Sequence, residues 1–161
     1  MHPRAAELID ALALHAHPEG GHYRRVHESA LRLHTAGGDR AALSAIHYLL
    51  AAGEFSRWHR VDADESWHHA EGDPLEIFVF EVETRSLTRH RLGRHDGTEG
   101  TNPLVVVPAH HWQAARPLGA YALVGCSVAP GFQFSGFTLL DDAPEVAASI
   151  EAADTELAAL A

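Results

Sequence analysis

Between residues 22 and 140 the sequence consists of short apolar or β-branched runs, each followed by glycine, proline, asparagine or aspartate. Many short runs at this spacing predict an antiparallel sandwich or barrel. The chain is therefore expected to be all-β. We expect strands over residues 22–28, 42–50, 55–61, 65–70, 75–82, 86–92, 104–107, 111–115, 121–128 and 132–139.

Two of these runs are continuously apolar, and a helical pattern flanks the strands at each end. The runs 77–80 and 105–107 are typical of strands that are covered on both faces. Residues 4–14 place leucines at helical spacing, and the alanine-rich stretch 144–160 begins with a proline in its first turn. We therefore expect one domain over residues 1–161, with a barrel over about 22–140 and a helix at each end.

The charge balance limits the classes of partner. Twelve Lys and Arg against 22 Asp and Glu give a net charge of −10, which disfavours binding to a phosphate backbone. No apolar run approaches the roughly 20 residues that span a bilayer, and the start of the chain carries no signal-peptide pattern. The single cysteine, Cys126, excludes an intramolecular disulfide and a cysteine-built zinc site. We expect a cytoplasmic protein that binds neither nucleic acid nor membrane.

The densest group of titratable side chains lies between residues 56 and 72. Strand alternation places His59 and Val61 on one face, and Glu65 on one face of the next strand with Trp67 and His69. If the two strands are antiparallel neighbours, His59 and Glu65 come within side-chain reach. A carboxylate beside an imidazole serves as a metal site, an acid–base pair or a buried ion pair.

The same segment resembles the first cupin motif, G-x5-H-x-H-x3,4-E-x6-G. His59, Glu65 and Gly72 fall in register with its first histidine, its glutamate and its last glycine, and Val61 stands at the second histidine. The second motif, G-x5-P-x-G-x2-H-x3-N, aligns with residues 102–113, where only the proline is kept. Gln113 stands at its histidine.

More narrowly, the chain is similar to uncharacterised single-domain cupins grouped near the sugar-nucleotide epimerase-like cupins. The resemblance spans about residues 5–140 and implies a double-stranded β-helix, or jelly-roll, barrel with a polar pocket. It also implies a homodimer, which would pair the N-terminal strands around residues 21–28. The blocks that carry it are residues 17–23, 44–50, 56–67, 107–115 and 125–132.

A cupin metal site generally uses three histidines and a glutamate. The resemblance therefore implies His59, Glu65 and Gln113 as metal ligands, although valine cannot ligate and a glutamine oxygen is a weak ligand for the metals that imidazole suits. His69 or His111 could complete the set by strand alternation. We expect no tightly bound cofactor, with a weakly bound divalent metal as the alternative.

The epimerase-like cupins invert a carbon next to a carbonyl with a histidine base and a tyrosine acid. For this chain the resemblance implies His59 or His68 as the base, Glu65 orienting the imidazole, and Tyr23 or Tyr48 as the proton donor. Tyr23 could equally be a core residue. The substrate would be a sugar or a sugar-nucleotide-like metabolite. Further candidates for ligand binding are His47, Tyr48, Trp58, Trp67, His69, His111 and Gln113.

Two other functions are consistent with these residues. The first is a non-catalytic sensor of a small polar or anionic metabolite, and the second is a metal-dependent cupin enzyme with a non-standard ligand set. Arg57 and Arg60 flank His59 and could bind an anionic group, or could form salt bridges with Asp62 or Asp64. We expect one of the three tryptophans to contact the ligand, and the others to be core residues.

Overall fold

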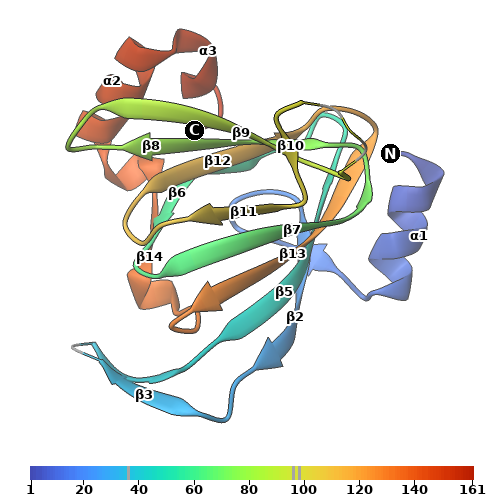
Figure 1. Cartoon of the computed structure of the whole chain (residues 1–161), viewed down its shortest axis with the longest axis horizontal. Helices are drawn as coiled ribbons and strands as arrows, with labels where there is room; N and C mark the ends of the chain where they lie inside the picture. Colours follow the sequence, from blue (N-terminus) through green and yellow to red (C-terminus); the bar gives the residue numbers. More distant parts are fainter. Residues whose placement is uncertain (36, 96, 98) are drawn as a thin grey trace.

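The computed structural model describes residues 1–35, 37–95, 97 and 99–161. Two six-stranded sheets face each other, and all of their strand pairs are antiparallel apart from β9 with β10 (Figure 1). The first sheet has the order β1 (His15–Ala16), β2 (His22–Glu28), β5 (Ser44–Ala51), β13 (Tyr121–Ala129), β7 (Asp64–Gly72), β11 (Leu104–Val107). The second has the order β10 (Thr101–Asn102), β9 (Ser86–Leu92), β8 (Leu75–Glu81), β12 (Trp112–Pro117), β6 (Ser56–Val61), β14 (Phe137–Leu139).

The all-β prediction is confirmed. Strands β1 and β10 and one hairpin lie outside the expected strands, and one expected strand is shorter. A hairpin of β3 (Arg32–Thr35) and β4 (Gly38–Ala41) forms a separate two-stranded sheet that extends away from the others in Figure 1. The expected strand over 132–139 is shortened to β14, preceded by the 3-10 turn η1 (Phe134–Gly136). The turn is joined to the end of β6 by the Asp62 amide, which donates to the Gly136 carbonyl at 3.1 Å.

The main core lies between the two sheets, where alternate side chains of each strand point inward. In β8, Ile77 and Val79 face this core, and Phe78 and Phe80 face outward under the C-terminal helices, so both faces are covered as predicted. The same prediction is wrong for β11. Val106 is 52% exposed, because no element of the described chain covers its outer face.

A helix covers the outer face of each sheet. Helix α1 (Pro3–Ala11) packs Ala5 and Leu8 against the first sheet, and it ends earlier than expected because Ala13 has a positive φ of 50°. Helices α2 (Pro144–Ala153) and α3 (Thr155–Ala158) cover the second sheet. They are separated at Asp154, whose carboxylate accepts from the first amides of α3. Within the described residues, no helix has the length and apolar character to cross a membrane.

The turn between β1 and β2 folds over one end of the space between the sheets. Gly20 has a φ of +108°, and a Cβ there would lie 2.2 Å from the Phe55 carbonyl oxygen, so only glycine fits. The Arg57 amide donates to the Glu19 carbonyl at 2.7 Å, which joins the turn to β6. These contacts hold the Glu19 side chain inside the molecule.

Candidate functional site

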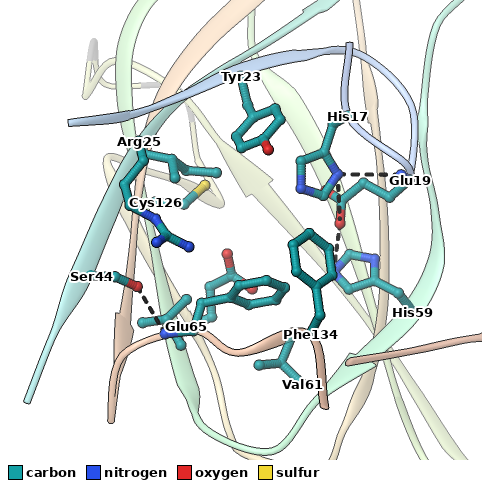
Figure 2. A pocket seen from close by; sticks show the side chains of 13 residues that line it. His17, Glu19, Tyr23, Arg25, Ser44, His59, Val61, Glu65, Cys126 and Phe134 are labelled. Carbon is teal, nitrogen blue, oxygen red and sulfur yellow. Dashed lines mark hydrogen bonds and ion pairs between the residues drawn. The ribbon is translucent and has the colours of Figure 1, made fainter. Parts of the chain in front are cut away.

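A pocket opens between the two sheets at the end that this turn covers. Its empty space, including the open mouth, is about 540 Å³. Strands of both sheets contribute to it, together with the turn before β2 and the segment after β13 (Figure 2). The lining residues are His17, Glu19, Tyr23, Arg25, Ser44, Ile46, His59, Val61, Glu65, Cys126, Val128, Phe132 and Phe134.

His59 lies on β6 and is only 1% exposed. Its Nδ1 atom lies 2.7 Å from the Arg57 carbonyl oxygen, which can only accept, so Nδ1 carries the proton. Its Nε2 atom lies 3.4 Å from Oε2 of Glu19. Burial lowers the pKa of His59, which favours the neutral imidazole with a free lone pair on Nε2.

Glu19 is the carboxylate beside this imidazole, and it is 6% exposed. The hydroxyl of Ser56 donates to its Oε1 at 3.0 Å, and Nδ1 of His17 lies 3.6 Å from its Oε2. Burial raises the pKa of Glu19 and lowers the pKa of His17. When His59 takes up a proton, the adjacent carboxylate stabilises the imidazolium.

Glu65 is the second buried carboxyl group of the pocket. The amide of Gln113 donates to its Oε2 at 2.7 Å, and the indole N–H of Trp67 donates at 3.1 Å to the amide oxygen of Gln113. Burial raises the pKa of Glu65 to about 7, although His59 and the Gln113 hydrogen bond oppose the rise. Near neutral pH the group is therefore poised to give or take a proton.

His59 and Glu65 are not on neighbouring strands, so the expected strand pairing is wrong. Strand β6 pairs with β12 and β14, whereas β7 pairs with β13 and β11. The chain crosses from one sheet to the other between these two strands, and the two side chains face the pocket from opposite sheets. Gln113, the register partner of His59 on β12, makes the bridge across to Glu65.

Three further predicted residues lie in or beside the pocket. Tyr23 lines it. Tyr48 is buried next to it, and its hydroxyl donates to the Gly20 carbonyl at 2.7 Å. The hydroxyl proton of Tyr48 is therefore already used in a hydrogen bond. Trp67 packs edge-on against Tyr48 and orients Gln113.

The other predicted residues do not line the pocket. His68 is exposed on the opposite face of β7 from Glu65, and Trp58 packs under the C-terminal helices, where it donates to the Leu157 carbonyl. Arg57 pairs with Asp141 at 2.6 Å, and Arg60 lies over the Trp112 ring. Among the remaining candidates, His47 is half-buried on β5, His69 is half-buried on β7, and His111 lies 3.8 Å from Glu81 on a shallow surface depression.

The residues at the cupin metal positions do not fit a three-histidine, one-glutamate site. Val61 carries no donor atom, and the amide oxygen of Gln113 already accepts the indole N–H of Trp67. The free nitrogen of His59 faces Glu19 rather than a set of converging ligands. Throughout the described residues, no group of three His, Cys, Asp or Glu side chains has the geometry to hold a metal ion.

Several lining residues are absent from the predicted site. The proline and glycines of residues 17–21 indicate a turn, and the pattern gives no sign that the Glu19 side chain folds inward. Arg25 follows Tyr23 by two positions on the same strand, so alternation from Tyr23 was the available signal. Ser44 lies at the start of β5, and the neighbouring residues give no indication that it lines a pocket.

Comparisons with known proteins identify the family of the chain. Residues 6–140 match the family described as Cupin superfamily (DUF985). A Shewanella oneidensis protein of known structure is 34% identical over 84% of this chain and 83% of its own, with a TM-score of 0.76. A hypothetical protein from Leishmania major is 28% identical over 91% of this chain and 96% of its own, with a TM-score of 0.78.

More distant structures share the fold alone. Oxalate decarboxylase from Bacillus subtilis is 15% identical, with a TM-score of 0.57, over 79% of this chain and 30% of its own. A comparison with curated proteins found no match. The family match covers most of the chain, and the 34% identical structure covers nearly as much. The chain has the cupin jelly-roll fold and belongs to the DUF985 family of the cupin superfamily.

Proposed function

We propose that the pocket binds a small polar metabolite and catalyses proton transfer at a carbon next to a carbonyl, as an epimerase or isomerase of sugar-like compounds. The observation that carries the proposal is the presence of a neutral imidazole and a carboxyl group with a pKa of about 7 in one buried pocket. A neutral base and an acid whose pKa is about 7 are matched to proton transfer near neutral pH.

The proposed step needs no oxidant or reductant. Nε2 of His59 removes the proton from the carbon, and the C–H electron pair forms the carbon–carbon double bond of an enol. The carbonyl π pair takes the proton of the Glu65 carboxyl group. In the return step Glu65 takes back the enol O–H proton, the carbonyl re-forms, and the C=C electron pair takes a proton from the Tyr23 hydroxyl on the other face of the carbon, which gives the epimer. The proton held by His59 then passes through solvent to the Tyr23 phenolate, so all three groups are restored. In an enediol, loss of the second hydroxyl's proton and protonation of the neighbouring carbon give the isomer.

Glu19 has a supporting role in this step. Its carboxylate lies 3.4 Å from Nε2 of His59, so it stabilises the imidazolium that forms when the proton is taken up. The Arg57 carbonyl fixes the ring from the other side through Nδ1. Together the two contacts set both the tautomer and the orientation of the base.

The proposed chemistry does not pass through a metal. The structure of one oxalate decarboxylase is described in terms of its Mn(II) centres. In the present chain, Val61 and the engaged Gln113 stand at two of the histidine positions of the cupin motifs. The carboxyl group of Glu65 supplies the proton for the carbonyl oxygen that a metal would otherwise polarise.

The test is solvent exchange. A panel of aldoses, ketoses and sugar nucleotides is incubated with the protein in D2O, and loss of the proton next to the carbonyl is followed by NMR. We expect exchange with at least one compound, and a rate about 10²- to 10⁴-fold lower in His59→Asn. His68→Asn is the matched control, because His68 is exposed on the outside of β7. Equal exchange rates in the two variants would show that His59 is not the base.

A further inference from the structure

Arg25 is the only arginine or lysine among the described residues that line the pocket. The two lining imidazoles, His17 and His59, are held toward their neutral forms by burial, which lowers the pKa of both. The two carboxyl groups, Glu19 and Glu65, carry negative charge when ionised. The only lining group that is positive at every pH of interest is therefore the guanidinium of Arg25.

Arg25 reaches the pocket from β2 with most of its hydrogen-bonding capacity unused. Tyr23 and Arg25 occupy alternate positions of this strand, and both line the pocket. The protein contact of the guanidinium is with Glu28, at 2.9 Å from one terminal nitrogen. The side chains of this pair are 44% and 46% exposed, and exposed pairs of this kind contribute little to stability. The other donors of the planar fork have no hydrogen-bond partner within the described part of the chain.

Arg25 is not the counter-ion of the catalytic carboxyl group. Within the described residues, no hydrogen bond or ion pair joins Arg25 to Glu65 or Glu19. None of the described pocket residues therefore serves as the counter-ion of the guanidinium. A cation at the wall of a ligand pocket, paired with an exposed carboxylate outside the pocket, fits an anionic group of the ligand.

Ser44 supplies a neutral donor on the same side. Its Oγ accepts a hydrogen bond from the backbone amide of Phe132 at 2.9 Å, and Ser44 is buried. This contact uses the hydroxyl oxygen as an acceptor, so the hydroxyl proton can be donated to a ligand in the pocket. Figure 2 shows Arg25 and Ser44 on one side of the pocket and His17, Glu19 and His59 on the other, with Glu65 between them. An elongated ligand can thus place one end at Arg25 and the other at the base.

We propose that Arg25, assisted by Ser44, binds an anionic group of the ligand, either a carboxylate or a phosphate, and so holds the opposite, carbonyl-bearing end against His59. This inference rests on the proposed function of the pocket and narrows its ligands to sugar-like compounds that carry an acidic group. A guanidinium fork binds both kinds of oxyanion with two parallel hydrogen bonds.

The test is a titration with inorganic phosphate and, separately, with acetate, followed by the NMR signals of Arg25 Nε–H and the pocket amides. We expect saturable binding of at least one anion by the wild type. Binding should be about 10- to 100-fold weaker in Arg25→Gln, the range for losing charge-assisted hydrogen bonds. The two anions distinguish a phosphate subsite from a carboxylate subsite.

Arg24→Gln is the matched control. Arg24 is the neighbouring residue on the exposed face of β2, where it donates to the Leu12 carbonyl, and its removal changes the net charge equally. We expect this variant to bind the anion like the wild type. Equal weakening in the two variants would show a net-charge effect and overturn the assignment, as would the absence of saturable binding of either anion by the wild type.

A second arm separates this inference from the proposed function. Phosphate and acetate are also titrated into His59→Asn, which lacks the base. Retained anion binding together with loss of proton exchange supports both proposals. Anion binding that Arg25→Gln leaves unchanged, in a protein whose exchange depends on His59, overturns the role of Arg25 and leaves the proton chemistry intact.

Discussion

The side-chain amide of Gln113 on β12 donates a 2.7 Å hydrogen bond to Oε2 of Glu65 on β7, so it joins the two facing sheets at the base of the pocket. The orientation of this amide is set by Trp67, whose indole N–H donates to the amide oxygen. Both members of the bridge are nearly inaccessible, with Gln113 1% and Glu65 7% exposed. Because the amide stabilises the ionised form of Glu65, it is a control on the proton affinity of this carboxyl group.

Replacing Gln113 with leucine should raise the pKa of Glu65 above about 7, because the hydrogen bond that favours the carboxylate is lost. The indole N–H of Trp67 also loses its acceptor, and leaving buried polar groups unpaired costs about 1–3 kcal/mol. The carboxyl pKa is measured by ¹³C NMR, and stability by urea unfolding at pH 8. Gln133→Leu is the control, since the half-buried Gln133 has no side-chain hydrogen bond within the described residues. An unchanged pKa would contradict the role of the bridge.

Glu65→Gln should remove a component of the pH dependence of stability. The pKa of Glu65 is about 7 in the folded protein against an ordinary value of 4.5, so protonation favours the fold. This stabilisation is complete below about pH 4.5 and is lost as the pH rises through about 7. The free energy of unfolding of the variant, relative to wild type, should therefore increase by on the order of 3 kcal/mol between pH 4.5 and 8.

The measurement is a series of urea unfolding curves across this pH range. Glu83→Gln, on the exposed surface, controls for the loss of one carboxyl group, and its difference from wild type should stay flat. Taking the difference between two proteins cancels the contribution of the titratable groups that do not interact with Glu65. A flat difference for Glu65→Gln as well would show that the carboxyl group has its ordinary affinity for protons.

The fold could be predicted from the sequence, because strand periodicity and turn residues are local signals. Residues 22–28, 86–92 and 104–107 form strands with the expected bounds. His59 and Glu65 could be selected because they lie in a dense titratable segment. Their positions on two facing sheets could not be predicted, because the pairing of strands depends on contacts between distant parts of the chain. Glu19 could not be predicted as a site residue for the same reason, since the inward direction of its side chain depends on the close approach of Gly20 to Phe55.

Gly20→Ala should be strongly destabilising and should displace Glu19 from His59. Both Gly20 and Gly53 have positive φ values, of +108° and +84°, where alanine is strained. At Gly20 a Cβ would also lie 2.2 Å from the backbone oxygen of Phe55, whereas nothing lies within 4 Å at Gly53. Gly53→Ala therefore measures the strain alone, about 1–2 kcal/mol, and Gly20→Ala should exceed it. Equal losses of unfolding free energy would show that the turn can shift without cost.

Chelation should leave proton exchange unchanged, because the residues at the cupin metal positions do not converge as ligands. The measurement compares exchange rates and metal content before and after dialysis against EDTA. The double variant Val61→His/Gln113→His supplies two imidazoles beside His59 and should gain Mn(II) binding, detected by electron paramagnetic resonance. A wild-type preparation with one equivalent of metal, and exchange that EDTA abolishes, would contradict the acid–base mechanism.

The rate of exchange should pass through a maximum close to neutral pH. The base is active only when His59 is neutral, and burial lowers its pKa below the ordinary 6.5, so the rate rises with pH on the acidic side. The acid is active only when Glu65 is protonated, and its pKa of about 7 makes the rate fall on the alkaline side. Glu65→Gln keeps the shape of the carboxyl group without its proton, so the alkaline decline should disappear and the remaining rate should be about 10²- to 10⁴-fold lower. If the rate of Glu65→Gln still declines above pH 7, the acid is a group other than Glu65. The same pH profile would then be measured for Tyr23→Phe, to see whether the decline disappears in that variant.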